Sequence, residues 1–231
     1  MVAFGDVPET RENALFLDFS NTITTVDSED MALTKYLEFV KEKNGIADGD
    51  IFVKFRQLRS RKLVDRERDF RTFVEINKEV LQELYHVPET YDEDYFQFHE
   101  KYLELREDFV PFVRLARKKV KVVMITDADN IYTERTIGAL GIKRYFDAIV
   151  TAEEVRSPKP FSPIFKKGLE LAGNPKKIIH VGDSERRDIE GARAMGFFTV
   201  LMNNDGKPTN ANATVHNFRE LMTLLMRLRF L

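Results

Sequence analysis

The chain has 231 residues, of which 43% are hydrophobic and 32% are charged, and its formal net charge at pH 7 is −2. This composition allows a packed core, the balanced charge gives no sign of a nucleic-acid binder, and the absence of cysteine excludes disulfides, zinc-thiolate sites and cysteine nucleophiles. The first residues lack the basic and apolar regions of a signal peptide, and no apolar stretch approaches the roughly 20 residues that span a bilayer, so we expect a cytoplasmic protein without membrane partners.

The first predicted element is a buried strand over residues 13–18, an apolar run that ends in Asp18. Ser20, Asn21 and Thr22 follow it in a pattern that is typical of a turn. We therefore expect the chain to enter a sheet early and to leave it at a carboxylate.

The hydrophobic spacing of the next segment, from about residue 27 to 106, predicts helices and almost no strand. The basic residues between Lys54 and Arg71 alternate with acidic ones and indicate mostly a solvated helix face, with contact to an anionic substrate as the alternative. The aromatic residues between Tyr85 and Tyr102 are expected in the core of this unit rather than in a substrate pocket. The predicted helices run from about 27 to the Asn44-Gly45 pair and over 48–60, 66–86 and 91–106.

The last segment alternates strands with helices, which predicts βαβ units and a parallel sheet. Since one strand precedes the helical segment, the α/β domain is split by an insertion. We predict a catalytic core formed by residues 1–26 and 107–231, and a helical cap formed by residues 27–106. The predicted strands are 120–125, 146–150, 178–181 and 197–201, and the predicted helices are 130–140, 161–172, 186–195 and 217–229.

The first polar residues after these strands are candidates for a site, because ligands of open α/β sheets bind beyond the carboxyl ends of the strands. Carboxylates gathered there repel one another, and a divalent cation relieves that repulsion. Mg²⁺ suits such a site because it prefers carboxylate, phosphate and water oxygens. Thr126 and Lys159 can then bind the remaining phosphate oxygens. The candidates are Asp18, Thr126, Asp127, Asp183, Asp188 and, before helix 161–172, Lys159.

Short motifs along the chain resemble those of the haloacid dehalogenase-like hydrolase superfamily, and they occur in that family's order. The resemblance implies a three-layer α/β fold with a Rossmann-like parallel sheet. It also implies an all-helical cap, inserted between the first two motifs, that closes over the active site. The motifs are Asp-Phe-Ser-Asn-Thr at 18–22, Thr126 after its apolar strand, Lys159 within Ser-Pro-Lys-Pro, and Gly-Asp-Ser at 182–184 followed by Asp188.

The same resemblance implies a role for each matching residue. Asp18 would be the nucleophile that attacks phosphorus and forms an aspartyl-phosphate. The phosphoryl group would be held by Thr126, Lys159 and backbone N–H groups near Asp127. The residues implied at the Mg²⁺ site are Asp18, the backbone carbonyl of Ser20, Asp183 and, supporting the site from behind, Asp188.

Ser20 departs from the pattern of the family's phosphatases, which carry a second aspartate at this position. That aspartate protonates the leaving group and then activates water. A serine hydroxyl cannot do this at neutral pH, and losing such a group costs about 10²–10⁴ in rate. We therefore predict a slow, Mg²⁺-dependent phosphatase for a small phosphorylated metabolite.

Alternative activities remain for such a chain. They are phosphoryl transfer, cleavage of a C–P or C–halogen bond, and binding of a phosphorylated metabolite with weak catalysis. The intact Gly182-Asp183 pair argues against a dehalogenase, because dehalogenases of this family need no metal and typically lack it.

Overall fold

The computed structural model describes residues 11–66, 68–87, 91–203 and 206–231. Its sheet begins with β1 (Asn13–Leu17), a strand that is buried after its first residue. Five further strands pair with it, all parallel, in the order β3-β2-β1-β4-β5-β6. The strand order reverses beside β1, and such a point is where Rossmann-like sheets bind their ligands. These strands are β2 (Lys121–Thr126), β3 (Ala148–Thr151), β4 (Lys177–Gly182), β5 (Phe198–Met202) and β6 (Ala213–Val215).

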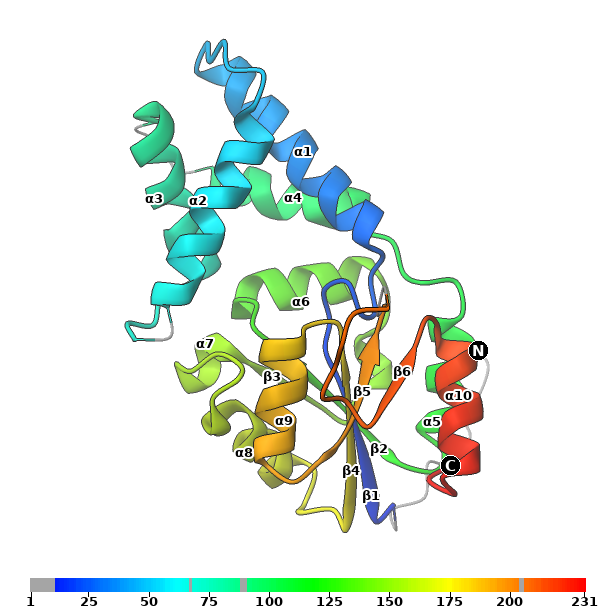
Figure 1. Cartoon of the computed structure of the whole chain (residues 1–231). Coiled ribbons are helices and arrows are strands. Elements are labelled where there is room, and N and C mark those ends of the chain that lie inside the picture. The colour runs from blue at the N-terminus through cyan, green and yellow to red at the C-terminus, as the bar shows by residue number, and fades with distance from the viewer. Residues whose placement is uncertain (1–10, 67, 88–90, 204–205) are drawn as a thin grey trace.

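Helices cover both faces of the sheet, because alternate side chains of each strand point to opposite sides (Figure 1). Leu15 and Leu17 belong to one apolar cluster with α5 (Phe109–Ala116), α6 (Asn130–Ala139) and α10 (Phe218–Arg227). Ala14 and Phe16 belong to a second cluster with α8 (Ser162–Leu171) and α9 (Gly191–Ala194). Shorter turns are α7 (Ala152–Val155), a 3₁₀ turn (Lys143–Tyr145) and a π-helical turn (Glu185–Glu190).

Between β1 and β2 the chain forms an all-helical segment, which stands apart from the sheet in Figure 1. Helix α1 (Val26–Lys43) packs on α4 (Asp92–Tyr102), and α2 (Ile51–Asp65) packs on α3 (Phe73–Tyr85). The Tyr36 and Tyr95 rings meet edge to face, 5.2 Å apart, in the core of this unit. The predicted fold class, a three-layer parallel sheet with an inserted helical segment, is thus confirmed.

The two chain segments that join the helices to the sheet run side by side. Thr24 and Leu105 form an antiparallel bridge. The backbone N–H of Thr25 donates to the carbonyl of Glu104, and that of Arg106 donates to the carbonyl of Ile23, each at 3.0 Å. We call residues 23–25 and 104–106 the paired crossing.

Several predicted boundaries were wrong. The helix predicted over 66–86 begins at Phe73, because Thr72 caps it through a reciprocal hydrogen-bonded box with Glu75. The helix predicted to reach 106 ends at Tyr102, since residues 104–106 belong to the paired crossing. No helix among the described residues is both long and apolar enough to cross a membrane.

Candidate active site

The sequence-predicted residues meet at the carboxyl edge of three adjacent strands. Asp18 follows β1, and its backbone N–H donates to the carbonyl of Val181 at 2.9 Å. Thr126 is the last residue of β2, and Asp183 follows β4. The ends of these parallel strands therefore bring the three residues together, as expected, although the strands lie far apart in the sequence.

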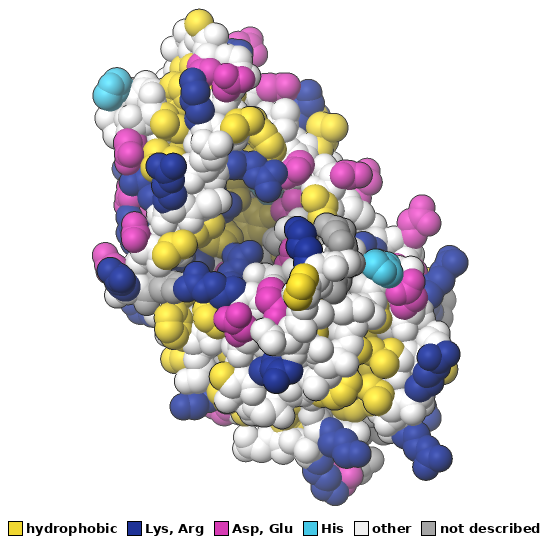
Figure 2. All heavy atoms as spheres, viewed as in Figure 1, with side chains coloured by type: hydrophobic (Ala, Val, Ile, Leu, Met, Phe, Trp, Pro, Cys, Tyr) yellow, Lys and Arg dark blue, Asp and Glu magenta, His cyan; other side chains and the backbone are white. Residues whose placement is uncertain are grey.

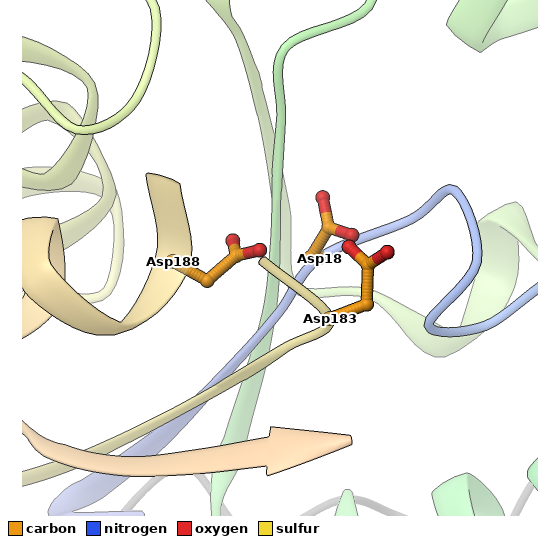
Figure 3. Close-up of side chains that lie close together, drawn as sticks. All are labelled: Asp18, Asp183 and Asp188. Carbon is orange, nitrogen blue, oxygen red and sulfur yellow. The ribbon is translucent and has the colours of Figure 1, made fainter. Parts of the chain in front are cut away.

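The carboxylates of Asp18, Asp183 and Asp188 form a cluster in which one oxygen of each lies within 4.8 Å of the others (Figure 3). Burial, together with the charges of Asp18 and Asp188, raises the pKa of Asp183 to about 7. Burial also raises the pKa of Asp18, although Lys159 opposes the shift. Hard oxygen ligands that repel one another in this way suit a divalent cation such as Mg²⁺.

Lys159 is a cation that contacts two carboxylates of the cluster, and its side chain is only 2% exposed. Its Nζ lies 2.5 Å from Asp18 Oδ1 and 2.7 Å from Asp188 Oδ1. Burial acts to lower the pKa of Lys159, but the charges of the two aspartates raise it, so the ammonium stays charged. His180 Nε2 lies 3.0 Å from the same oxygen of Asp188. Although burial acts to raise it, the pKa of Asp188 is lowered by Lys159 and His180.

The loop after β2 carries the remaining predicted residues. Thr126 is buried, and its Oγ1 accepts a hydrogen bond from the backbone N–H of Ala128 at 3.2 Å. The carboxylate of Asp127 accepts the backbone N–H of Lys159 at 2.8 Å. The Asp127 side chain thereby fixes the loop that carries Lys159. The sequence had indicated a role only for the backbone near Asp127.

Two further residues at the site were missed. The hydroxyl of Thr22 donates to Asp18 Oδ2 at 2.9 Å, and thus holds the carboxylate oxygen that Lys159 does not contact. Glu29, in the first turn of α1, accepts a hydrogen bond from Thr24 Oγ1 at 2.5 Å. Removal from bulk water raises the pKa of Glu29 to about 7, while hydrogen bonds from Thr24 and Ser20 act to lower it. An acidic residue in a helix's first turn is common, so only the fold reveals that Glu29 lies beside Ser20.

Arg66 connects the helical segment to the loop after β2, and it is a buried exception to the mostly solvated face expected between Lys54 and Arg71. Its side chain is 2% exposed and lies between the rings of Phe70 and Phe73, 4.5 Å from each. Nη1 donates to the backbone carbonyl of Asp127 at 2.7 Å, and Nη2 lies 3.6 Å from Asp129. Asp129 in turn accepts the first two backbone N–H groups of α3, at 2.8 and 3.1 Å. We call this the Arg66–Asp129 interlock.

A cavity of about 260 Å³ lies between the helical segment and the aspartate cluster. Figure 2 shows a hollow between the two parts of the molecule, with Lys and Arg side chains around it. Asp18, Ser20, Thr126 and Lys159 line the cavity from the sheet side. The helical segment adds apolar, aromatic and charged side chains, among them Leu33, Arg59, Phe73, Tyr95 and His99.

Comparison with known proteins agrees with the fold. The model of the haloacid dehalogenase-like hydrolase family matches residues 12–196. The chain therefore belongs to this family of hydrolases, as its motifs predicted.

Curated relatives match only part of the chain, at about 30% identity. The pyrimidine 5'-nucleotidase YjjG of Escherichia coli is 30% identical over 122 residues, which cover 49% of this chain and 54% of the relative. The N-acylneuraminate-9-phosphatase of Rattus norvegicus is 32% identical over 108 residues, covering 46% and 44%. The chain thus spans about half the length of the curated relatives that it matches.

Solved structures share the fold over nearly the whole chain. The HAD-hydrolase YfnB of Bacillus subtilis, in a magnesium-bound form, has a TM-score of 0.79 at 19% identity and covers 94% of this chain and 99% of its own. A HAD phosphatase of Thermococcus onnurineus has a TM-score of 0.73 at 23% identity, covering 92% and 97%.

Proposed function

We propose that the chain is a Mg²⁺-dependent phosphatase that acts on a small phosphorylated metabolite through an aspartyl-phosphate at Asp18. The observation that carries this proposal is the setting of Asp18, which stands in a carboxylate cluster beside the ammonium of Lys159 at the edge of a cavity. The similarity to a 5'-nucleotidase and to an N-acylneuraminate-9-phosphatase supports phosphate esters as the substrate class.

The residues divide the chemistry between them. Thr22 and Lys159 each hold one oxygen of Asp18, which orients the carboxylate for attack. Asp18 would form a bond to phosphorus while the ester oxygen leaves with the bonding electrons and takes a proton from water. Water would then cleave the aspartyl-phosphate. Because phosphoryl transfer depends mainly on positioning and charge neutralisation, Thr126 and Lys159 would contribute by binding the phosphoryl oxygens.

Mg²⁺ would be held by Asp18, Asp183 and the backbone carbonyl of Ser20, with Asp188 supporting the site. When bound, it would neutralise charge on the phosphoryl oxygens. The close carboxylate oxygens and the raised pKa of Asp183 both support a cation at this place.

Turnover is proposed to be slow because Ser20 stands where related phosphatases carry an aspartate. Ser20 lines the cavity, but its hydroxyl cannot exchange a proton with the leaving group at neutral pH as an aspartate at this position would. This feature also favours an aspartyl-phosphate that persists long enough for transfer to another acceptor.

The helical segment is proposed to act as a cap. Residues 27–106 would close over a core made of residues 1–26 and 107–231, of which 1–10 lie outside the described residues. The cavity between the two parts and the paired crossing, which joins them along one line, support this division.

The test is hydrolysis of p-nitrophenyl phosphate by the full chain, with and without Mg²⁺. We expect Mg²⁺-dependent release of nitrophenol and its loss in Asp18→Asn. Asp27→Asn, an exposed aspartate in the first turn of α1, is the matched control and should keep the rate of the natural protein. Full activity in Asp18→Asn would overturn the covalent mechanism. Metal-independent release of halide from a 2-haloacid would instead assign dehalogenase chemistry.

A further inference from the structure

Arg59, on α2, lines the cavity that contains Asp18 and is held there in a fixed orientation. Its Nε donates to Asn77 Oδ1 at 2.8 Å. Its guanidinium lies 4.7 Å from the centre of the Phe73 ring. The first contact uses Nε, and the second places the guanidinium carbon near the ring. The two terminal nitrogens form no hydrogen bond with any residue that the structure describes.

The charge of Arg59 also lacks a direct counter-ion. Within the described ranges of the chain it forms no ion pair, whereas Arg56 on the same helix pairs with Asp30 at 2.8 Å. A half-buried cation that is held rigidly, with no ion pair among the described residues, is already arranged to bind an anion, because little conformational freedom is lost on binding. The terminal nitrogens of arginine match a carboxylate in particular, since both groups are planar and form two parallel hydrogen bonds.

The titratable side chains of Glu29 and His99 share the cavity with Arg59. Burial raises the pKa of Glu29 to about 7, although the charge of Arg59 acts to lower it, and no ion pair joins the two among the described residues. Burial lowers the pKa of His99 to about 4, and the charge of Arg59 acts in the same direction, so the imidazole is neutral at pH 7. His99 Nδ1 lies 2.7 Å from the carbonyl of Tyr95 and therefore donates to it, which leaves Nε2 as an acceptor. A neutral acceptor beside a cation suits a substrate that carries a hydroxyl as well as an anionic group.

We propose that Arg59 binds a carboxylate on the leaving-group side of the substrate, and that the preferred substrates are small phosphate monoesters of hydroxy acids. This inference rests on the proposed phosphatase function and names its substrate class. The cavity volume of about 260 Å³ agrees with such a compound, because it lies below the range of roughly 300–1,000 Å³ that is typical of pockets for larger ligands.

The experiment compares kcat/KM for three esters: 3-phosphoglycerate, glycerol 3-phosphate and glycerol 1,3-bisphosphate. We expect the natural protein with Mg²⁺ to prefer 3-phosphoglycerate over glycerol 3-phosphate by about 10- to 100-fold, as a charge-assisted bidentate contact provides. In Arg59→Gln this ratio should fall towards one, mainly through a higher KM for 3-phosphoglycerate. Arg59→Lys, which keeps the charge but not the fork, should give an intermediate ratio.

Arg61→Gln is the matched control, because Arg61 is exposed on the same helix, and it should keep the ratio of the natural protein. An equal loss for both monoesters in Arg59→Gln would show that Arg59 only supports packing and would overturn the inference. A preference for the bisphosphate would overturn the assignment to a carboxylate. Hydrolysis of p-nitrophenyl phosphate without any preference among the three would refute the inference while the proposed function stands. Failure to hydrolyse any ester would overturn both.

Discussion

Replacing Arg66 with alanine should destabilise the protein strongly, although the alternating charges around Arg66 predict a side chain exposed to solvent. The change removes two hydrogen bonds to backbone carbonyls, one to Asp127 at 2.7 Å and one to Arg71 at 2.5 Å. It also removes the cation that lies between the rings of Phe70 and Phe73.

The magnitude follows from these contacts. A hydrogen bond to a charged group contributes about 1.5–3 kcal/mol, and breaking a buried ion pair on one side costs about 3–5 kcal/mol. In the variant, the Asp129 carboxylate still accepts the two backbone N–H groups of α3, so the cost of burying it without Arg66 is reduced. The variant also no longer bears the cost of removing the Arg66 charge from water. We therefore expect a loss of about 3 kcal/mol in the free energy of unfolding, which lowers Tm by about 6–12 °C in a domain of this size.

The assay is urea denaturation followed by circular dichroism, with thermal unfolding as a second measure. Arg61→Ala is the matched control, since it removes an exposed arginine of α2 and should change the free energy of unfolding by less than about 0.5 kcal/mol. If Arg66→Ala costs no more than Arg61→Ala, then the Arg66–Asp129 interlock does not stabilise the fold and the reasoning is wrong.

Other changes test the buried histidine, the strand end and the missing acid. Between pH 4 and its ordinary value of 6.5, His99 binds a proton only when the chain is unfolded, so at most about 3 kcal/mol of stability is lost as pH falls through this window. His99→Gln should flatten the dependence of the urea midpoint on pH, and an unchanged slope would contradict this. In Gly182→Ala the new Cβ would lie 2.1 Å from Asp188 Cγ, so calorimetry should show about 10–100-fold weaker Mg²⁺ binding, whereas Gly138→Ala, in open space on α6, should not weaken it. Ser20→Asp should raise kcat for p-nitrophenyl phosphate by about 10²-fold or more, and a rate at or below that of the natural protein would show that this acid is not what limits turnover.

The sheet could be predicted from the sequence because its central strands are buried on both faces. Strands β1, β2 and β4 are mostly apolar, with His180 as a buried exception in β4, and each ends at the polar residues that the site uses. Strand β6 (Ala213–Val215) was missed because three residues at the edge of a sheet carry too little pattern. Helix α5 was missed although Phe109 and Val113 are fully buried, because its short apolar sequence lies next to the strand that follows.

The site was predictable where its residues lie at the end of a strand or in a motif. Asp18 and Asp183 directly follow strands and Thr126 ends one, so the sheet brings these three together. Lys159 and Asp188 were identified from the motifs around them.

Arg66 and Glu29 come from the helical segment, and their places depend on how that segment packs against the sheet. The charge pattern around Arg66 is the same whether its side chain faces water or the loop after β2. Hydrophobic periodicity therefore cannot identify it.

Because of the paired crossing, the chain enters the helical segment and leaves it at neighbouring positions in space. A short turn between Thr24 and Leu105 would connect β1 to β2 without changing their register. The proposed nucleophile and the other carboxylates of its cluster lie at the edge of the sheet, whereas Arg59 lies in the helical segment. On these proposals, bond cleavage and substrate choice depend on different stretches of the sequence. One stretch can be exchanged, by evolution or by design, while the other is inherited unchanged.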